Sequence, residues 1–228
     1  MRVDGSDRLQ LAPSTLMGTE PQWSPDGKKI AFGSTVPGHG SSVYVVAVDG
    51  GPPQRIVDNG LIPSWSPDGN ALAYGGWVPP AESGYEIRVI DLRTGNTSVI
   101  SDSQGKFGPQ WSPDGRLLMA NTGEAGDLLL FDFQTGKWSE LAKGSFVNWV
   151  WSQDGKYVYC VESGPGEPRA LRIRISDRHA EVITSLKAIR RVNDELIGDG
   201  AGAAPDGSLL LTRDVGTQEV YGLNVKWP

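Results

Sequence analysis

Serine recurs in this sequence within a short motif, in a setting where it could carry chemistry. The heptapeptide PQWSPDG at 21–27 returns almost unchanged at 63–69 and at 109–115. A serine can act as a nucleophile when a histidine lies beside it as a base. The only two histidines, His39 and His179, stand at no repeated position near these serines. We therefore interpret the serine as structural and predict no catalytic residue.

Aspartate recurs with the serine, and its carboxylate could bind a metal ion. The aspartates of the motif are Asp26, Asp68, Asp114, Asp154 and Asp206. Calcium needs six to eight oxygen ligands converging on one point, whereas these carboxylates belong to separate repeats. The stretch NDELIGDG adds Asp194, Glu195 and Asp199, but without the spacing of a calcium loop. We predict turn capping at the motif, a solvated loop at NDELIGDG, and no metal or other cofactor.

The motif marks an internal repeat that determines the expected fold. Its markers lie 42, 46, 40 and 52 residues apart, at Trp23, Trp65, Trp111, Trp151 and, in the degenerate copy AAPDG, Ala203. An interval of about 45 residues is typical of a propeller blade with four strands. Each of the first four units has a short run ending at the marker, then three further runs with strand patterning. We predict an all-β propeller of five blades, forming one domain over 1–228.

The two ends of the chain are expected to close this ring together. The fifth unit lacks a fourth strand, and the N-terminus aligns with the end of a unit. A strand at about 8–12 could pair with VYGLNV at 220–225 and so remove two exposed sheet edges. We expect a monomer if the ring closes and a homo-oligomer otherwise.

The letters of the motif are those that a tight turn between strands requires. Proline sets φ at the second position, aspartate tolerates the third, and glycine accepts the left-handed conformation. The serine is expected to hydrogen-bond to turn amides, and the tryptophan to pack between blades. The residues assigned these structural roles are Trp23, Asp26, Gly27, Trp65, Asp68, Gly69, Trp111, Asp114, Gly115, Trp151, Asp154 and Gly155. Because Ala203 replaces the tryptophan, the fifth blade is expected to be the most loosely packed.

Binding residues are expected on the face opposite the motif turns. The loops there differ from unit to unit, and residues that vary while the fold repeats are candidates for function. The candidates are Trp77, Tyr85, Glu82, His39, Glu20, Phe107, Trp149 and Arg169. Trp77 is the foremost of them, because two glycines precede it and two prolines follow closely.

Composition excludes other classes of partner. The net charge is −6 with lysine and arginine spread along the chain, which argues against nucleic-acid binding. The single cysteine, Cys160, cannot form an intrachain disulfide and is expected in the core. No run of about 18 apolar residues occurs, so we predict no membrane contact by this segment and find no targeting signal.

The W-S-P-D-G repeat, with an apolar strand after it, resembles the TolB-like or PD40 branch of the β-propellers, a variant of the WD40 theme. The resemblance covers essentially all of the chain and implies the propeller fold. TolB-like proteins carry six blades and a separate α/β domain, and neither the sixth blade nor that domain is present here. The ending at 209–228 is similar to the C-termini of large bacterial regulators. That likeness implies a periplasmic or extracytoplasmic sensor module of a larger parent.

Three hypotheses about function remain. The first is a non-enzymatic propeller that binds a protein or peptide as a sensor or scaffold. The second is the propeller of a lyase-type or peptidase-type enzyme, although no G-x-S-x-G elbow is found. The third is a truncated or engineered propeller without a function of its own. Histidine and carboxylates converging at the channel mouth would favour an enzyme, whereas an apolar, aromatic rim would favour binding.

Overall fold

The structure is a computed structural model and describes residues 9–77, 84–123, 126–189, 201–203 and 209–211. In this part of the chain, four sheets each contain four strands, and β17 and β18 form a separate pair. Consecutive strands in every sheet pair antiparallel. The all-β propeller with four-stranded blades is therefore confirmed. The fifth blade is represented by β17 (Ala201–Ala203) and β18 (Leu209–Leu211) only, and the rest of its predicted strands lie outside the described residues.

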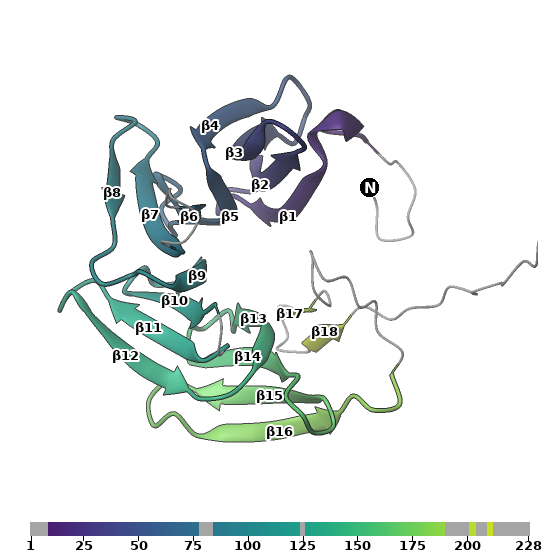
Figure 1. Ribbon diagram of the computed structural model, residues 1–228, viewed down its shortest axis with the longest axis vertical. Helices are drawn as coiled ribbons and strands as arrows, with labels where there is room; N and C mark the ends of the chain where they lie inside the picture. The colour runs from purple at the N-terminus through teal and green to yellow at the C-terminus, as the bar shows by residue number, and fades with distance from the viewer. Residues whose placement is uncertain (1–8, 78–83, 124–125, 190–200, 204–208, 212–228) are drawn as a thin grey trace, which may run out of the picture.

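The strands of each blade follow one another from the centre outward (Figure 1). Blade 1 consists of β1 (Gly18–Trp23), β2 (Lys29–Val36), β3 (Gly40–Ala47) and β4 (Gln54–Asp58). Blade 2 consists of β5 (Gly60–Trp65), β6 (Ala71–Trp77), β7 (Tyr85–Asp91) and β8 (Thr97–Val99). Blade 3 consists of β9 (Lys106–Trp111), β10 (Leu117–Thr122), β11 (Leu128–Asp132) and β12 (Lys137–Ala142). Blade 4 consists of β13 (Phe146–Trp151), β14 (Tyr157–Glu162), β15 (Arg169–Arg174) and β16 (Ala180–Ser185). In blades 1 to 4, the motif turn therefore joins the innermost strand to the second strand.

The hydrophobic core lies between neighbouring blades. Alternate residues of the second and third strands face opposite neighbours, so each sheet contributes apolar side chains to two junctions. In the junction of blades 3 and 4, Met119 and Leu130 pack with Val158 and Cys160. Cys160 is fully buried there, in the core position that the sequence predicts. Side-chain packing thus holds neighbouring blades together, in addition to single hydrogen bonds between them such as that from the Trp65 indole to the Gln22 carbonyl.

Each innermost strand contains a bulge that the sequence analysis did not predict. The pairing register slips in all four, and the residue three places before the tryptophan has a left-handed φ. These residues are Glu20 (φ 51°), Ile62 (φ 51°), Gly108 (φ 62°) and Asn148 (φ 53°). A left-handed φ is unusual for a β-branched residue such as Ile62, so the bulge is a constraint of the fold.

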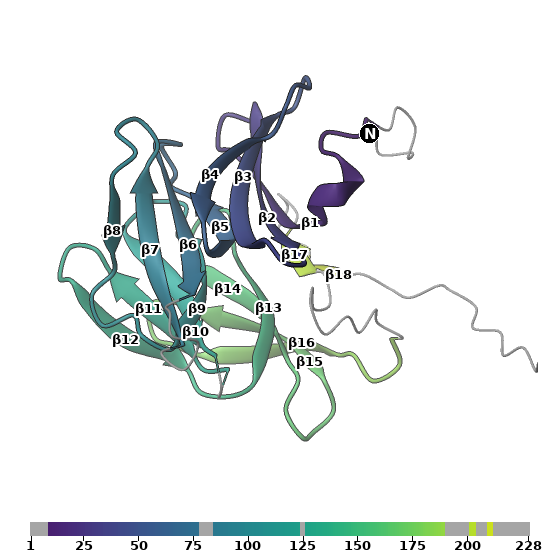
Figure 2. The same cartoon turned by 45° about the horizontal axis from the view of Figure 1, so that its top comes forward.

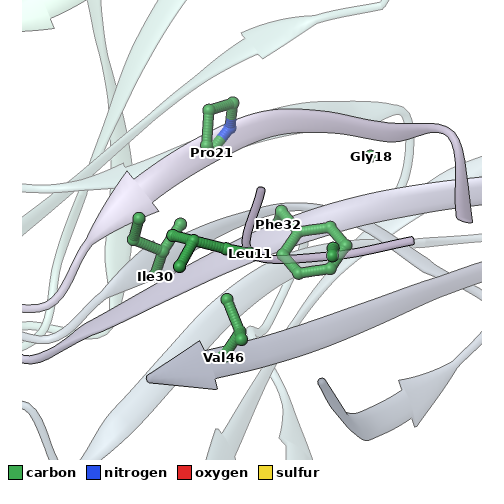
Figure 3. A pocket seen from close by; sticks show the side chains of 7 residues that line it. Leu11, Gly18, Pro21, Ile30, Phe32 and Val46 are labelled. Carbon is green, nitrogen blue, oxygen red and sulfur yellow. The ribbon is translucent and has the colours of Figure 1, made fainter. Parts of the chain in front are cut away.

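The N-terminal segment covers the free face of blade 1 without forming the predicted strand. Residues 9–12 are not in a strand, and the 3-10 helix η1 (Ser14–Leu16) follows beside β2 (Figure 2). Leu11 contributes to an apolar hollow of about 190 Å³ together with Ile30, Phe32 and Val46 (Figure 3). Ring closure stays a prediction, because residues 212–228 lie outside the described part.

Candidate functional site

The four motif turns carry one pattern of hydrogen bonds. In blade 1, the Ser24 hydroxyl donates to the Asp26 carboxylate (2.7 Å) and accepts from the backbone N–H of Lys29 (2.9 Å). The Asp26 carboxylate also accepts from the backbone N–H of Lys28 (3.1 Å). The same three bonds recur at 66–71, 112–117 and 152–157. The serine hydroxyl therefore serves the turn, through the amide contact that the sequence predicts.

These bonds also keep the turn carboxylates charged. The Ser66 hydroxyl, followed by the backbone and side-chain N–H groups of Asn70, lowers the pKa of Asp68 to about 2. The pKa values of Asp26, Asp114 and Asp154 are lowered as well, in each case chiefly by the turn serine. Within the described residues, no three histidine, cysteine or carboxylate side chains gather where they could hold a metal ion.

Successive turns stack on one another around the ring and form one continuous face. The turn glycines have φ between 68° and 74°, the left-handed conformation that the motif predicts. A Cβ atom at Gly69 would lie 3.8 Å from Pro25 Cδ, and one at Gly115 would lie 3.5 Å from Pro67 Cδ. We call this surface the turn face.

The motif tryptophans differ in how they meet the preceding blade. The indole N–H of Trp65 donates to the carbonyl of Gln22 (3.1 Å), and that of Trp151 donates to the carbonyl of Gln110 (3.2 Å). Both side chains are buried between blades, as predicted. Trp23 is 63% exposed, because no described blade lies against it.

Trp111 is the exception among the tryptophans that have a preceding blade. Its backbone N–H donates to the Ser64 hydroxyl (3.0 Å), and its ring stacks on Phe133 with 5.3 Å between centroids. It is only half-buried. The junction of blades 2 and 3 is therefore filled differently from the junction of blades 1 and 2 and from that of blades 3 and 4.

A concave hollow lies at the centre of the turn face, and we call it the central hollow. It has a volume of about 820 Å³ and is bounded by the innermost strands and motif turns of all four blades. Its lining consists of Trp23, Trp65, Trp111, Trp149, Trp151, Pro25, Pro67, Pro113, Gln22, Gln110, Gln153, Ser64, Ser112 and Val150. Among the described residues of this lining there is no charged side chain and no histidine. The rim is aromatic and apolar with a few amide and hydroxyl groups.

Three glutamines supply the free polar groups of the central hollow. The side chains of Gln22, Gln110 and Gln153 have no hydrogen-bond partner within the described ranges. Sequence reasoning missed them because it assigned the whole motif to folding. The signal that could have found them is their position, since glutamine precedes the tryptophan in two units and replaces the turn proline in another.

The structure brings one pair of the predicted binding residues together and gives two others partners outside the predicted set. The rings of Tyr85 and Phe107 lie 4.5 Å apart between centroids, at the junction of blades 2 and 3. Trp149 covers Gly108, donates its indole N–H to the Gly108 carbonyl (3.3 Å) and lines the central hollow. Arg169 pairs with Glu162 at the β14–β15 loop.

The remaining candidates do not join a common site. His39 is exposed in the β2–β3 turn. Glu20 is half-buried at the blade 1 bulge, and burial raises the pKa of its carboxyl group. Trp77 ends β6, but its side chain and all of Glu82 lie outside the described residues. The binding roles of these residues stay predictions.

Comparison with known proteins was made by family model, by sequence and by structure. No family model matches the chain, and no curated protein matches it in sequence. Among solved structures, TolB from Acinetobacter baumannii is 22% identical with a TM-score of 0.66, covering 83% of this chain and 52% of that one. The chain thus spans about half the length of that TolB.

Two further structures show the same arrangement of blades. A TolB-type protein of Agrobacterium tumefaciens is 19% identical with a TM-score of 0.70, covering 88% of this chain and 75% of that one. The propeller domain of the Trilobed protease from Pyrococcus furiosus is 16% identical with a TM-score of 0.59, covering 87% and 79%. At these identities the likeness concerns the fold. The chain has the TolB-like β-propeller fold.

Proposed function

We propose that this chain is a non-enzymatic propeller that binds a peptide segment of a protein partner in the central hollow, as a sensor or scaffold module. The observation that carries the proposal is the lining of that hollow. Tryptophan and proline side chains supply apolar contact area, and free glutamine amides supply hydrogen bonds. This combination suits an extended peptide, whose backbone needs both donors and acceptors.

The alternative of an enzyme has less support from the same lining. General acid–base or nucleophilic chemistry needs a titratable group directed at the substrate. The described lining of the central hollow includes neither histidine nor carboxylate, and the turn serines are engaged with their own aspartates. Solved propellers of similar fold occur both as TolB and within prolyl endopeptidases, so the fold by itself favours neither role.

The test is selection of peptides from a random display library on the purified chain, followed by affinity measurement with variants. The double variant Gln22→Ala, Gln110→Ala removes two amides that face the hollow and make no bond within the described protein. We expect it to bind the selected peptide about tenfold more weakly or worse, from the loss of one or two hydrogen bonds. The matched control Gln134→Ala removes an exposed amide in the β11–β12 turn and should leave affinity unchanged.

Two outcomes would overturn the proposal. One is that the selected peptides bind the double variant as tightly as the unaltered chain. The other is that the chain cleaves or otherwise converts a selected peptide at a rate well above the rate in buffer alone.

A further inference from the structure

The junction of blades 2 and 3 is open on the turn face where the other two junctions are filled. Trp65 and Trp151 are buried at the junctions with blades 1 and 3. At the junction of blades 2 and 3, Trp111 instead stacks on Phe133, and a hollow of about 530 Å³ lies beside it. We call this hollow the blade 2/3 groove. It shares Trp111 and Pro67 with the central hollow, so the two adjoin.

The blade 2/3 groove combines an aromatic wall with negative charge. Its lining includes Trp111, Val89 and three carboxylates, those of Asp68, Asp91 and Asp114. Hydrogen bonds within the turns lower the pKa of all three, so they are ionised at neutral pH. No lysine or arginine is among the described residues that line the groove. An aromatic ring beside carboxylates is the setting in which proteins bind cationic groups.

The neighbouring blade shows which cation fits this position. In blade 3, Arg116 Nη2 lies 3.0 Å from Asp132 Oδ2, where the start of the second strand lies beside the end of the third. The equivalent residues in blade 2 are Asn70 and Asp91. The Asn70 side chain donates to Asp68 instead (2.9 Å). Asp91 therefore lacks the guanidinium partner that its counterpart has.

The cation nearest to Asp91 does not replace that partner. Arg93 Nη2 lies 4.0 Å from Asp91 Oδ2, and the Arg93 side chain is 84% exposed. A pair of this kind contributes little in water. Asp91 lines the groove together with Trp111, and its side chain is 42% exposed, so its carboxylate stays available to a ligand.

We propose that the blade 2/3 groove binds the guanidinium group of an arginine side chain of the partner, against Trp111 and between Asp91 and the two turn aspartates. The planar guanidinium can stack on the indole while its N–H groups reach the carboxylates. That the arginine belongs to a peptide in the central hollow rests on the proposed function. Binding of the guanidinium itself does not, and it can be tested alone.

The experiment titrates the chain with N-acetylarginine amide and follows the indole signals in ¹H–¹⁵N NMR spectra. The variant Trp111→Phe identifies the Trp111 signal. We expect this signal to shift on titration, and the neutral isostere N-acetylcitrulline amide to leave it in place. N-acetyllysine amide should bind several-fold more weakly than the arginine compound, because it has no planar face.

Asp91→Asn should weaken binding of N-acetylarginine amide about tenfold or more, the loss expected for one charge-assisted hydrogen bond. The asparagine keeps the oxygen that accepts from the backbone N–H groups of Arg93 and Thr94, so the turn should stay folded. The control Asp154→Asn removes one charge from the turn face of blade 4, two blades from Asp91, and should leave the affinity for N-acetylarginine amide unchanged.

The proposal is overturned if citrulline shifts the signal as much as arginine, if lysine binds as tightly as arginine, or if Asp91→Asn and Asp154→Asn behave alike. Failure here is separate from failure of the proposed function. If guanidinium binding fails, selected peptides should still be sensitive to the Gln22 and Gln110 changes. If the proposed function fails, the groove should still bind arginine.

Discussion

Trp65 and Trp23 occupy the same motif position, yet the structure predicts very different costs for their removal. Trp65 is 8% exposed between blades 1 and 2 and donates its indole N–H to the Gln22 carbonyl (3.1 Å). Trp23 is 63% exposed. The comparison holds the residue type, the turn and the strand position constant, so the difference reports the neighbouring blade alone.

The expected magnitudes follow from the buried area. A tryptophan side chain buries roughly 150–250 Å² when fully covered, which corresponds to about 4–6 kcal/mol at about 25 cal/mol per Å². Trp65→Ala should therefore lower the free energy of unfolding by about 4–5 kcal/mol, including its hydrogen bond. Trp23→Ala should lower it by about 1.5–2 kcal/mol, since little over a third of its side chain is covered.

The assay is equilibrium unfolding in urea followed by far-UV circular dichroism, with the slopes compared between variants to check that the transitions are equivalent. If Trp65→Ala does not fold, Trp65→Phe serves in its place. It keeps most of the packing and loses the indole N–H, which should cost about 1 kcal/mol. The reasoning is refuted if the two alanine variants lose equal stability, because Trp23 would then need a blade packed against it in solution.

Three further predictions concern the bulge, the turns and the buried thiol. Gly108→Ala should cost about 2–4 kcal/mol in a urea titration, because its Cβ would lie 2.5 Å from Trp149 Cζ2 at a left-handed φ; the control Gly136→Ala has open space and should cost only about 1 kcal/mol. The folded-state pKa of Asp68, about 2, lies below the unfolded value of about 3.9. The contribution of ionised Asp68 to the free energy of unfolding should be present above about pH 4 and disappear as the pH falls toward 2. Thermal melts across this range should show a falling Tm. A Tm that stays level would contradict the lowered pKa. Cys160 is buried, and burial raises its pKa to about 12, so it should react with a thiol reagent only after denaturant is added. Rapid labelling of the native chain would contradict that burial.

Much of the fold could be predicted from the sequence because its signals are local. The hydrogen bonds of each motif turn join residues within five positions of one another, as between Ser24 and Lys29. The alternation of apolar and polar residues marks the second and third strands in the same local way. The bulges at Glu20 and Ile62 were not predicted, although a proline follows each of these residues. The sequence analysis assigned the prolines to the short run that ends at the tryptophan.

The candidate site was less accessible to sequence reasoning. The predicted residues were sought in loops that vary between units, and of those whose side chains the structure describes, only Trp149 lines the central hollow. The glutamines of that hollow belong to the repeat itself, and nothing in a single unit shows that their side chains have no partner. A site built from equivalent positions of several blades becomes visible only when the blades are placed around one centre.

The sequence alone determined the repeat, the four-stranded unit and the chemistry of its turns, because a turn is stabilised by groups a few residues apart. Only the tertiary structure decided what each repeated tryptophan does, because its partner stands more than forty residues away in the preceding blade. The Trp65 indole N–H donates to the Gln22 carbonyl and the side chain is buried, whereas the Trp111 ring stacks on Phe133 and stays half-exposed. The same motif tryptophan therefore fills a blade junction at Trp65 and borders a groove at Trp111.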